Sequence, residues 1–161
     1  MNLRRVARSA VPGLPEGHEI FARAAARATE IGLEYAGAVT PVEAWALLQA
    51  QLATLVDVRT AAEYRFVGRV PGTVHVEWTG GEVQQRAAFV QNLRTIARTD
   101  QALLLLCRSG VRSHAAAVAA TEAGFKRGYN VLEGFEGRID PTHQRGNLDG
   151  WRFHRLPWVQ D

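Results

Sequence analysis

The sequence predicts an α/β fold, with a parallel sheet of about five strands and helices on both of its faces. Two observations lead to this expectation. Short runs of β-branched or apolar residues recur along the chain, at 54–58, 73–76, 102–106 and 129–132, with a shorter run near 38–39. Helical segments separate most of these runs. Strands that alternate with helices form parallel sheets whose strands are buried on both sides.

Two helix starts are marked by capping boxes. Thr40 and Thr60 each stand three residues before a glutamate, and Thr40 is followed by proline at the first helical position. We therefore expect helices to begin near residues 41 and 61. Further helices are expected over 18–35, 83–97 and 111–123. Gly124 follows the last of these helices and suits a left-handed C-cap.

The length and composition indicate one globular domain. The chain has 161 residues, of which 47% are hydrophobic and 22% charged, values that exclude disordered and collagen-like classes. The longest apolar stretch, 102–107, is far shorter than the roughly 20 residues that span a membrane. We divide the chain into an N-terminal arm and helix, 1–36, and a main domain, 37–161, whose aromatic C-terminal tail should wrap the surface and bury its tryptophans.

The net charge of +3 is confined to the start of the chain. Residues 1–27 hold five arginines against two glutamates, whereas the remainder is balanced. We expect a solvated basic arm that includes Arg4, Arg5 and Arg8, and we expect no nucleic-acid partner. Because Pro12 and Gly13 stand where a signal peptide would place its apolar block, a cytoplasmic protein is expected.

Cys107 is the single cysteine, so an internal disulfide is impossible. The five histidines are scattered without the spacing of metal ligands, and we expect neither a metal nor another cofactor. A functional Cys107 would act as a free thiol, which survives in the reducing cytoplasm.

A lone cysteine at a strand end is usually a buried structural residue, but the loop that follows Cys107 favours a reactive thiol. It follows four leucines and precedes a loop that leads into a helix, which places it at the carboxyl end of a central strand, where open α/β sheets bind ligands. Loop N–H groups and the helix dipole would stabilise a thiolate or an anionic substrate there. Arg108 and Arg112 flank this loop and could also attract the oxygens of an anionic sulfur compound.

Several motifs, in order along the chain, together resemble the rhodanese family of sulfurtransferases. They are Leu55-Val56-Asp57-Val58-Arg59 with Glu63, Gly68-Arg69-Val70-Pro71-Gly72-Thr73, the loop from Cys107 to Ser113, and Asn130-Val131-Leu132-Glu133-Gly134. The resemblance covers roughly residues 38–138, and the ending Leu156-Pro157-Trp158 is similar to single-domain bacterial members. It implies a three-layer domain in which Cys107 forms the persulfide, while Asp57 and Arg59 are structural residues near the site. The resemblance also implies that the substrate is bound by the loop residues after Cys107, through their amides and through two positions that are often basic in thiosulfate-using members: Arg108, Ser109, Gly110, Val111 and Arg112.

The resemblance also implies a reaction. Sulfane sulfur would move from thiosulfate or a persulfide donor to a thiophilic acceptor, which could itself be a protein, through a persulfide on Cys107. Two alternatives stay open. One is a non-catalytic interaction module, although such modules commonly replace the cysteine. The other is a phosphatase or an enzyme similar to arsenate reductases, whose loop is one residue longer than the four residues between Cys107 and Arg112.

Three other side chains allow two interpretations each. His114 follows the loop and could act as a general base, but its helical position favours the helix surface. His75 lies between two valines, so a hydrogen-bonded strand histidine is preferred over a ligand. Phe135 follows the last strand and could form an apolar wall of the cleft.

Overall fold

The computed structural model describes residues 17–161, and the arginines of the expected basic arm lie outside this range. The elements in chain order are α1 (Gly17–Ile31), β1 (Gly37–Val39), α2 (Pro41–Gln49), β2 (Thr54–Asp57), a π-helical turn η1 (Glu63–Val67), β3 (Val74–His75), α3 (Val83–Ile96), β4 (Leu103–Leu106), α4 (Val111–Glu122) and β5 (Gly128–Val131). These bounds agree with the expected elements to within a few residues, apart from α1, which ends earlier, and the segment after residue 60.

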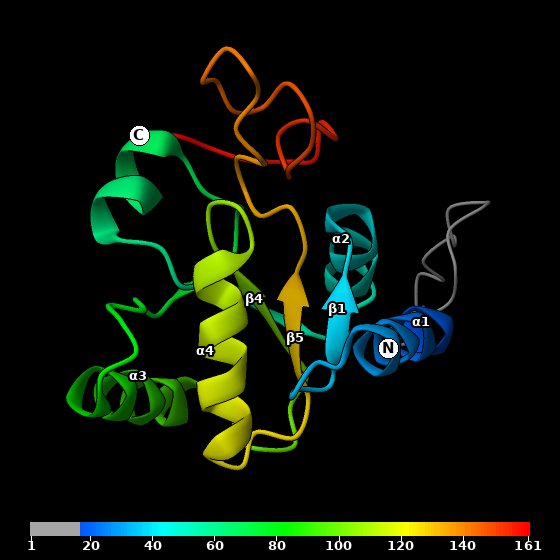
Figure 1. Cartoon of the computed structure of the whole chain (residues 1–161), viewed down its shortest axis with the longest axis vertical. Coiled ribbons are helices and arrows are strands. Elements are labelled where there is room, and N and C mark those ends of the chain that lie inside the picture. Colours follow the sequence, from blue (N-terminus) through cyan, green and yellow to red (C-terminus); the bar gives the residue numbers. More distant parts are fainter. Residues whose placement is uncertain (1–16) are drawn as a thin grey trace, which may run out of the picture.

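The five strands form one parallel sheet in the order β1-β5-β4-β2-β3 (Figure 1). The apolar strand β4 lies at its centre, where Leu105 pairs with Val56 of β2 on one side and with Asn130 of β5 on the other. A strand in this position is covered on both faces and has no exposed edge, which explains its continuous run of leucines. The predicted fold class is confirmed.

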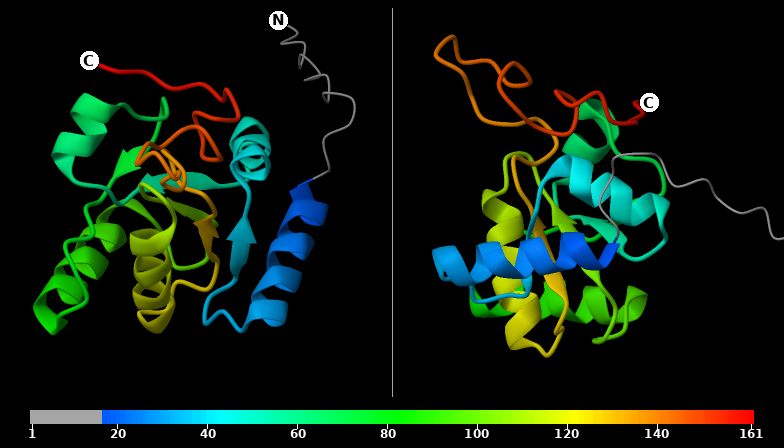
Figure 2. Two further views of the ribbon diagram at one scale, coloured as in Figure 1. Left: turned by 45° about the horizontal axis from the view of Figure 1, so that its top comes forward. Right: turned by 90° about the vertical axis from the view of Figure 1, so that its right-hand side faces the viewer.

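Side chains of β4 alternate between two cores. Leu103, Leu105 and Cys107 pack in one core with α3 and α4, whereas Leu104 and Leu106 pack in the other with α1 and α2. Figure 2 shows these two pairs of helices on opposite sides of the sheet. The three layers follow from the strand period of two, because successive residues of a strand point to opposite faces.

Both predicted capping boxes form, with different outcomes. Thr40 and Glu43 exchange side-chain and backbone hydrogen bonds at the start of α2. Thr60 and Glu63 make the same exchange, and the helical segment that follows is short: residues 61–62 are α-helical and Glu63–Val67 form the π-helical turn η1. That turn ends at Gly68, whose φ is 117° and where a Cβ would lie 2.7 Å from the Trp158 ring. The expected helix start near 61 is confirmed, and the helical segment is short because it ends at Gly68, where the chain lies against Trp158 of the C-terminal tail.

The C-terminal tail folds over the carboxyl ends of the strands (Figure 1). Trp151 is fully buried, and its indole N–H donates to the Pro157 carbonyl at 2.9 Å. Val159 pairs with Arg69 through two backbone hydrogen bonds of 2.8 Å. The expectation that the tail buries its tryptophans is confirmed for Trp151 and is wrong for Trp158, which is 39% exposed.

Helix α1 packs against β1 and contributes to the second core. Its residues Ile20, Ala24 and Ala28 are buried. The division of the chain at residue 36 stays a prediction. No helix within residues 17–161 is long and apolar enough to cross a membrane.

Candidate functional site

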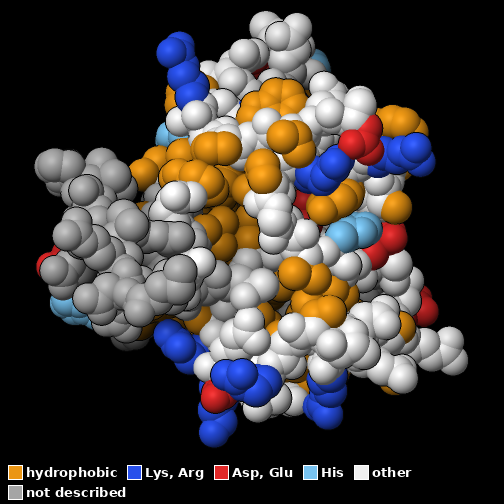
Figure 3. Space-filling view, turned by 180° about the vertical axis from the view of Figure 1, so that it is seen from behind, with side chains coloured by type: hydrophobic (Ala, Val, Ile, Leu, Met, Phe, Trp, Pro, Cys, Tyr) orange, Lys and Arg blue, Asp and Glu red, His pale blue; other side chains and the backbone are white. Residues whose placement is uncertain are grey.

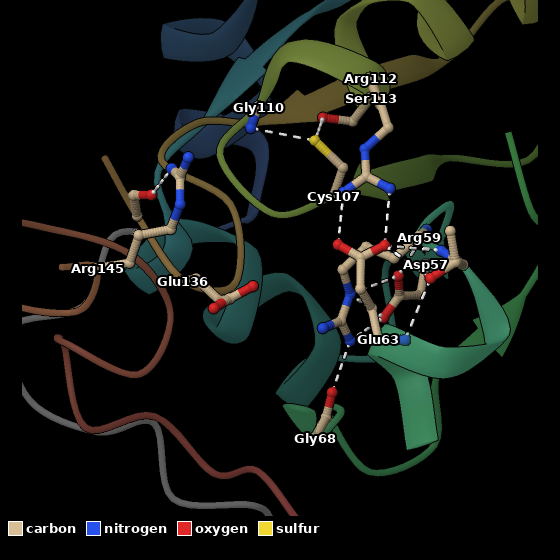
Figure 4. A network of polar contacts seen from close by, with 12 residues as sticks. Asp57, Arg59, Glu63, Gly68, Cys107, Gly110, Arg112, Ser113, Glu136 and Arg145 are labelled. Atoms are coloured by element: carbon tan, nitrogen blue, oxygen red, sulfur yellow. Dashed lines mark hydrogen bonds and ion pairs between the residues drawn. The ribbon is translucent and has the colours of Figure 1, made fainter. Parts of the chain in front are cut away.

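Cys107 directly follows β4 and has only 1% of its surface exposed. Its sulfur accepts a hydrogen bond from the Gly110 N–H at 3.1 Å and another from the Ser113 hydroxyl at 3.2 Å (Figure 4). Both groups belong to the loop and first helical turn that the sequence places after the strand. The Gly110 N–H is a donor in any state of the site, whereas the single Ser113 proton can go either to the sulfur or to Oδ1 of Asn130, 2.6 Å from the hydroxyl. Negative charge on the sulfur, as a thiolate or a persulfide, favours donation to the sulfur.

The segment after β5 holds the cysteine loop in place through backbone hydrogen bonds. The carbonyls of Cys107 and Arg108 accept hydrogen bonds from the N–H groups of Phe135 and Glu136 at 2.8 and 2.9 Å. The two chain segments approach so closely that a Cβ on Gly134 would lie 2.4 Å from the Arg108 carbonyl carbon. Because a trans peptide places its N–H opposite its C=O, the following amides turn to the other side of the loop.

Gly110 is the N-cap of α4 and has a φ of 97°, in the region that favours glycine. The conformation directs its own N–H at the sulfur. Val111 follows with a side chain that is 74% exposed, so the chain can serve the site there only through its backbone. Among the amides of residues 108–112, the described contacts include only that of Gly110 with the sulfur, and a wider cradle stays a prediction.

Arg112 is bound to Glu63. Its two terminal nitrogens donate to the two carboxylate oxygens at 2.8 and 2.7 Å, and Figure 4 shows the guanidinium beside Cys107. Burial alone would raise the pKa of the Glu63 carboxyl, but hydrogen bonds from Arg112 and Thr60 outweigh it and lower the pKa to about 2. The hydrogen bonds to Glu63, with added attraction to Cys107, raise the pKa of Arg112. Most of the Arg112 charge is therefore already compensated.

Arg108 has a different environment. Its side chain is exposed, and within residues 17–161 no ion pair or side-chain hydrogen bond of Arg108 is found. The two arginines that the sequence groups together as substrate-binding residues thus differ in availability. Arg108 has a charge free to meet an incoming anion, whereas Arg112 would first have to leave Glu63.

Asp57 and Arg59 lie behind Glu63 and are completely buried. The guanidinium donates to the Asp57 carboxylate at distances down to 2.6 Å and to the Gly68 carbonyl at 2.7 Å. Its carbon lies 4.4 Å from the centre of the Phe135 ring, and its remaining nitrogen has no hydrogen-bond partner within the described chain. This pair joins β2 to the segment before β3 and has no surface that a substrate could reach.

Several contacts of the site could not be read from the sequence. Ser113 was not expected to touch the sulfur, although its place six residues after Cys107, in the first turn of α4, was a usable signal. The pairing of Glu63 with Arg112 and the contact of Asn130 with Ser113 at 2.6 Å join segments that are distant in the chain. Phe135 is fully buried beneath Arg59 and forms no wall of a cleft.

The two histidines near the site both have partners. His75 contacts the Arg59 carbonyl through Nε2 at 2.6 Å, which fits the preferred interpretation of a hydrogen-bonded strand histidine. His114 is exposed at the surface of α4, and its Nδ1 lies 2.7 Å from the Tyr35 hydroxyl.

A cavity of about 420 Å³ lies elsewhere, beside Trp45, Leu48 and Pro71. None of its lining residues is charged, and Cys107 is not among them. Figure 3, which shows the molecule from behind, has an area of hydrophobic side chains with positively charged side chains near its margins. The cavity offers no group for chemistry, so the loop of Cys107 remains the candidate site.

The fold and the site together define a parallel α/β domain with a cysteine loop between a central strand and a helix. The model of the family described as "Rhodanese-like domain" matches residues 40–138. The chain belongs to this family.

Relatives and solved structures agree with this assignment. A protein of Rickettsia prowazekii named "Uncharacterized protein RP600" is 37% identical over 113 residues, which cover 66% of this chain and 82% of that protein. "Thiosulfate sulfurtransferase GlpE" of Actinobacillus succinogenes is 31% identical over 100 residues, which cover 62% of this chain and 80% of that protein. The crystal structure of Rv0390 from M. tuberculosis is 44% identical with a TM-score of 0.69, and the match covers 80% of this chain and all of that one.

Proposed function

We propose that this protein is a sulfurtransferase that carries sulfane sulfur on Cys107. The observation that supports this most strongly is the sulfur of Cys107, at the carboxyl end of β4, receiving hydrogen bonds from Gly110 and Ser113. The relative named thiosulfate sulfurtransferase supports the same chemistry for this chain.

The first step loads the enzyme. The Cys107 thiolate attacks the outer sulfur of thiosulfate, a sulfur–sulfur bond forms, and the bond within the donor breaks so that its electron pair leaves with sulfite. The product is a persulfide whose terminal sulfur is anionic. N–H and O–H donors near Sγ favour this charge in a site from which water is largely excluded.

The second step unloads the enzyme. A thiophilic acceptor, cyanide in an assay or a thiolate in the cell, attacks the terminal sulfur. The bond between the two sulfurs breaks, and its electron pair returns to Cys107 as the thiolate. Because every nucleophile and every leaving group in the two steps is an anion, neither step needs a separate general acid or base. A persulfide donor follows the same path with a thiolate as its leaving group.

The alternatives have less support. An interaction module would not need a cysteine held by two donors. A phosphatase would need a free arginine and a wider loop, whereas Arg112 is paired with Glu63. The physiological donor, a protein acceptor and the cytoplasmic location stay predictions.

The intact mass of the protein tests the proposal. Incubation with thiosulfate should add the mass of one sulfur atom, and cyanide should then remove it with release of thiocyanate. The variant Cys107→Ser should keep its mass throughout. An unchanged mass of the native protein with thiosulfate and with a small persulfide donor would contradict the proposed function.

A further inference from the structure

One hydroxyl oxygen lies within reach of both the sulfur of Cys107 and a buried asparagine. Ser113 Oγ is 3.2 Å from the sulfur, toward which it points in Figure 4, and 2.6 Å from Oδ1 of Asn130. Ser113 is completely buried, and Asn130 is 4% exposed. A hydroxyl has one proton to donate, so only one of the two acceptors receives it at a time. Because Oγ is in place for both, only the O–H bond has to turn.

The Asn130 side chain presents its oxygen, and not its nitrogen, to Ser113. Its Nδ2 donates to the Gly110 carbonyl at 3.1 Å, so Oδ1 is the atom on the side of Ser113. The backbone of Asn130 pairs with Leu105 of the central strand β4, next to Cys107. An amide oxygen accepts hydrogen bonds and cannot donate them. With a neutral thiol, the hydroxyl therefore donates to Asn130 while its oxygen can accept the S–H proton.

The charge on Cys107 decides which acceptor the hydroxyl proton meets. In the empty, ionised enzyme the charge lies on Sγ itself, and a hydrogen bond to an ionised acceptor is stronger than one to a neutral amide. The hydroxyl then turns to the sulfur. In the persulfide, Sγ is a bridging sulfur, which is a weak acceptor, and most of the charge lies on the terminal sulfur, one bond further from Oγ. The Ser113 proton therefore stabilises the empty enzyme more than the loaded one.

We propose that Ser113 is a catalytic residue of the unloading step, in which its hydroxyl turns from Asn130 to the sulfur as negative charge returns to Sγ. The acceptor binds the terminal sulfur, the bond between the two sulfurs breaks, and its electron pair goes to Sγ. No proton changes owner, because the hydroxyl keeps its proton and only redirects it. This inference rests on the proposed function, whose leaving group it improves. The same hydrogen bond opposes loading at equilibrium, since it stabilises the thiolate relative to the persulfide.

The balance between loaded and empty enzyme tests this role. In mixtures of thiosulfate and sulfite, the Cys107 thiolate and thiosulfate exchange with the persulfide and sulfite, and the intact mass gives the loaded fraction. At a pH where the thiol is ionised, Ser113→Ala should raise the equilibrium constant for loading by about three- to tenfold, because the thiolate loses a charged hydrogen bond. Removal of the bound sulfur by cyanide in a single turnover should become slower.

A matched pair of variants isolates the hydroxyl from the volume of the side chain. Ser113→Thr and Ser113→Val add nearly the same volume at a buried position and differ mainly in the hydroxyl. We expect Ser113→Val to load like Ser113→Ala, and Ser113→Thr to stay close to the native balance. Thr121→Val is the control on the same helix, since it removes a hydroxyl that donates to the Ala117 carbonyl at 2.8 Å. It should leave loading and unloading unchanged.

Alkylation tests the same hydrogen bond without any sulfur transfer. The chain has a single cysteine, so the pH dependence of its reaction with iodoacetamide reports thiolate formation. The midpoint of this profile should rise by about 0.5 to 1 pH unit in Ser113→Ala and Ser113→Val, but not in Ser113→Thr. The charged groups near the sulfur, Arg112 and Glu63 with Asp57 and Arg59 behind them, are the same in all these variants and cannot account for a difference.

The outcomes separate this inference from the proposed function. A native loading equilibrium and a native alkylation profile in Ser113→Ala would overturn the role of Ser113. Equal effects of Ser113→Thr and Ser113→Val would also overturn it, because the hydroxyl would then not be the cause. A raised alkylation midpoint in Ser113→Ala, together with no sulfur transfer by the native protein, would instead contradict the proposed function and support the hydrogen bond to the thiolate.

Discussion

Arg112 and Glu63, 49 residues apart in the chain, form a two-pronged ion pair beside the sulfur of Cys107, with contacts of 2.8 and 2.7 Å. The pair links the turn η1 to the first turn of α4. It thereby joins the segment after β2 to the cysteine loop, while leaving little of the Arg112 charge for a substrate.

Glu63→Gln should lower stability in a way that depends on pH. The pKa of Glu63 in the folded protein, about 2, lies below its usual value of 4.5. Its contribution is therefore fully present above about pH 4.5 and is lost as the pH falls toward 2. Near neutral pH, we expect the free energy of unfolding of the variant, measured with urea, to be lower than that of the native protein by about 2 kcal/mol. This difference should become smaller below pH 4. Glu122→Gln, which removes an exposed partner of Arg86, should cost less than about 0.5 kcal/mol. Equal losses at pH 7 and pH 3 for Glu63→Gln would refute the ion-pair argument.

Arg108→Gln should weaken the binding of thiosulfate more than the binding of an uncharged persulfide donor. The exposed guanidinium attracts a doubly negative donor, and its removal should raise the KM for thiosulfate by about fivefold, or ~1 kcal/mol. Salt screens such an interaction, so the difference should fade in 0.5 M salt. Arg98→Gln, which alters an exposed arginine just before the amino end of β4, serves as the control. The same change in KM for both donors would mean that Arg108 has no electrostatic role.

Arg112→Gln should behave differently from Arg108→Gln. Removal of the Arg112 guanidinium leaves Glu63 without its main partner and loosens the cysteine loop. Activity should therefore fall with both sulfur donors, and it should stay low at high salt. Steady-state kinetics with each donor at two ionic strengths would separate the two arginines. A salt-sensitive effect confined to thiosulfate would show that Arg112 binds the substrate directly.

Cys107→Ser should abolish sulfur transfer while leaving the fold in place. Serine is slightly smaller and can accept the same hydrogen bonds from Gly110 and Ser113, so we expect a change in stability of less than about 1 kcal/mol. Circular dichroism and thiocyanate formation from thiosulfate and cyanide would be measured on one preparation. Substantial turnover in the folded variant would exclude Cys107 as the sulfur carrier.

The protein should not hydrolyse para-nitrophenyl phosphate. Four residues separate Cys107 from Arg112, whereas a phosphatase loop has five residues before its arginine. The position where a phosphatase has that arginine holds Ser113, which is buried and cannot make a charged bidentate contact with phosphate oxygens. One residue inserted before Arg112 should widen the loop and give measurable binding of phosphate or arsenate. Robust phosphatase turnover that disappears in Cys107→Ser would favour the phosphatase alternative.

Features set by neighbouring residues could be predicted from the sequence. The buried strand before Cys107 follows from its run of leucines, and the start of α2 follows from the exchange between Thr40 and Glu43, three residues apart. Gly110 could likewise be placed in the loop between that strand and α4. These elements depend on hydrophobic periodicity and on hydrogen bonds within one turn, so short segments carry their signals.

Only the tertiary structure decided which side chains meet around the sulfur. Arg108 and Arg112 look equivalent in the sequence, but the fold brings Glu63 to Arg112 alone. Ser113 and Asn130 are 17 residues apart, and the pairing of β5 with β4 brings the asparagine next to the first turn of α4. Such pairings depend on the order and register of the strands, to which residues throughout the chain contribute, and so no local pattern in the sequence can specify them.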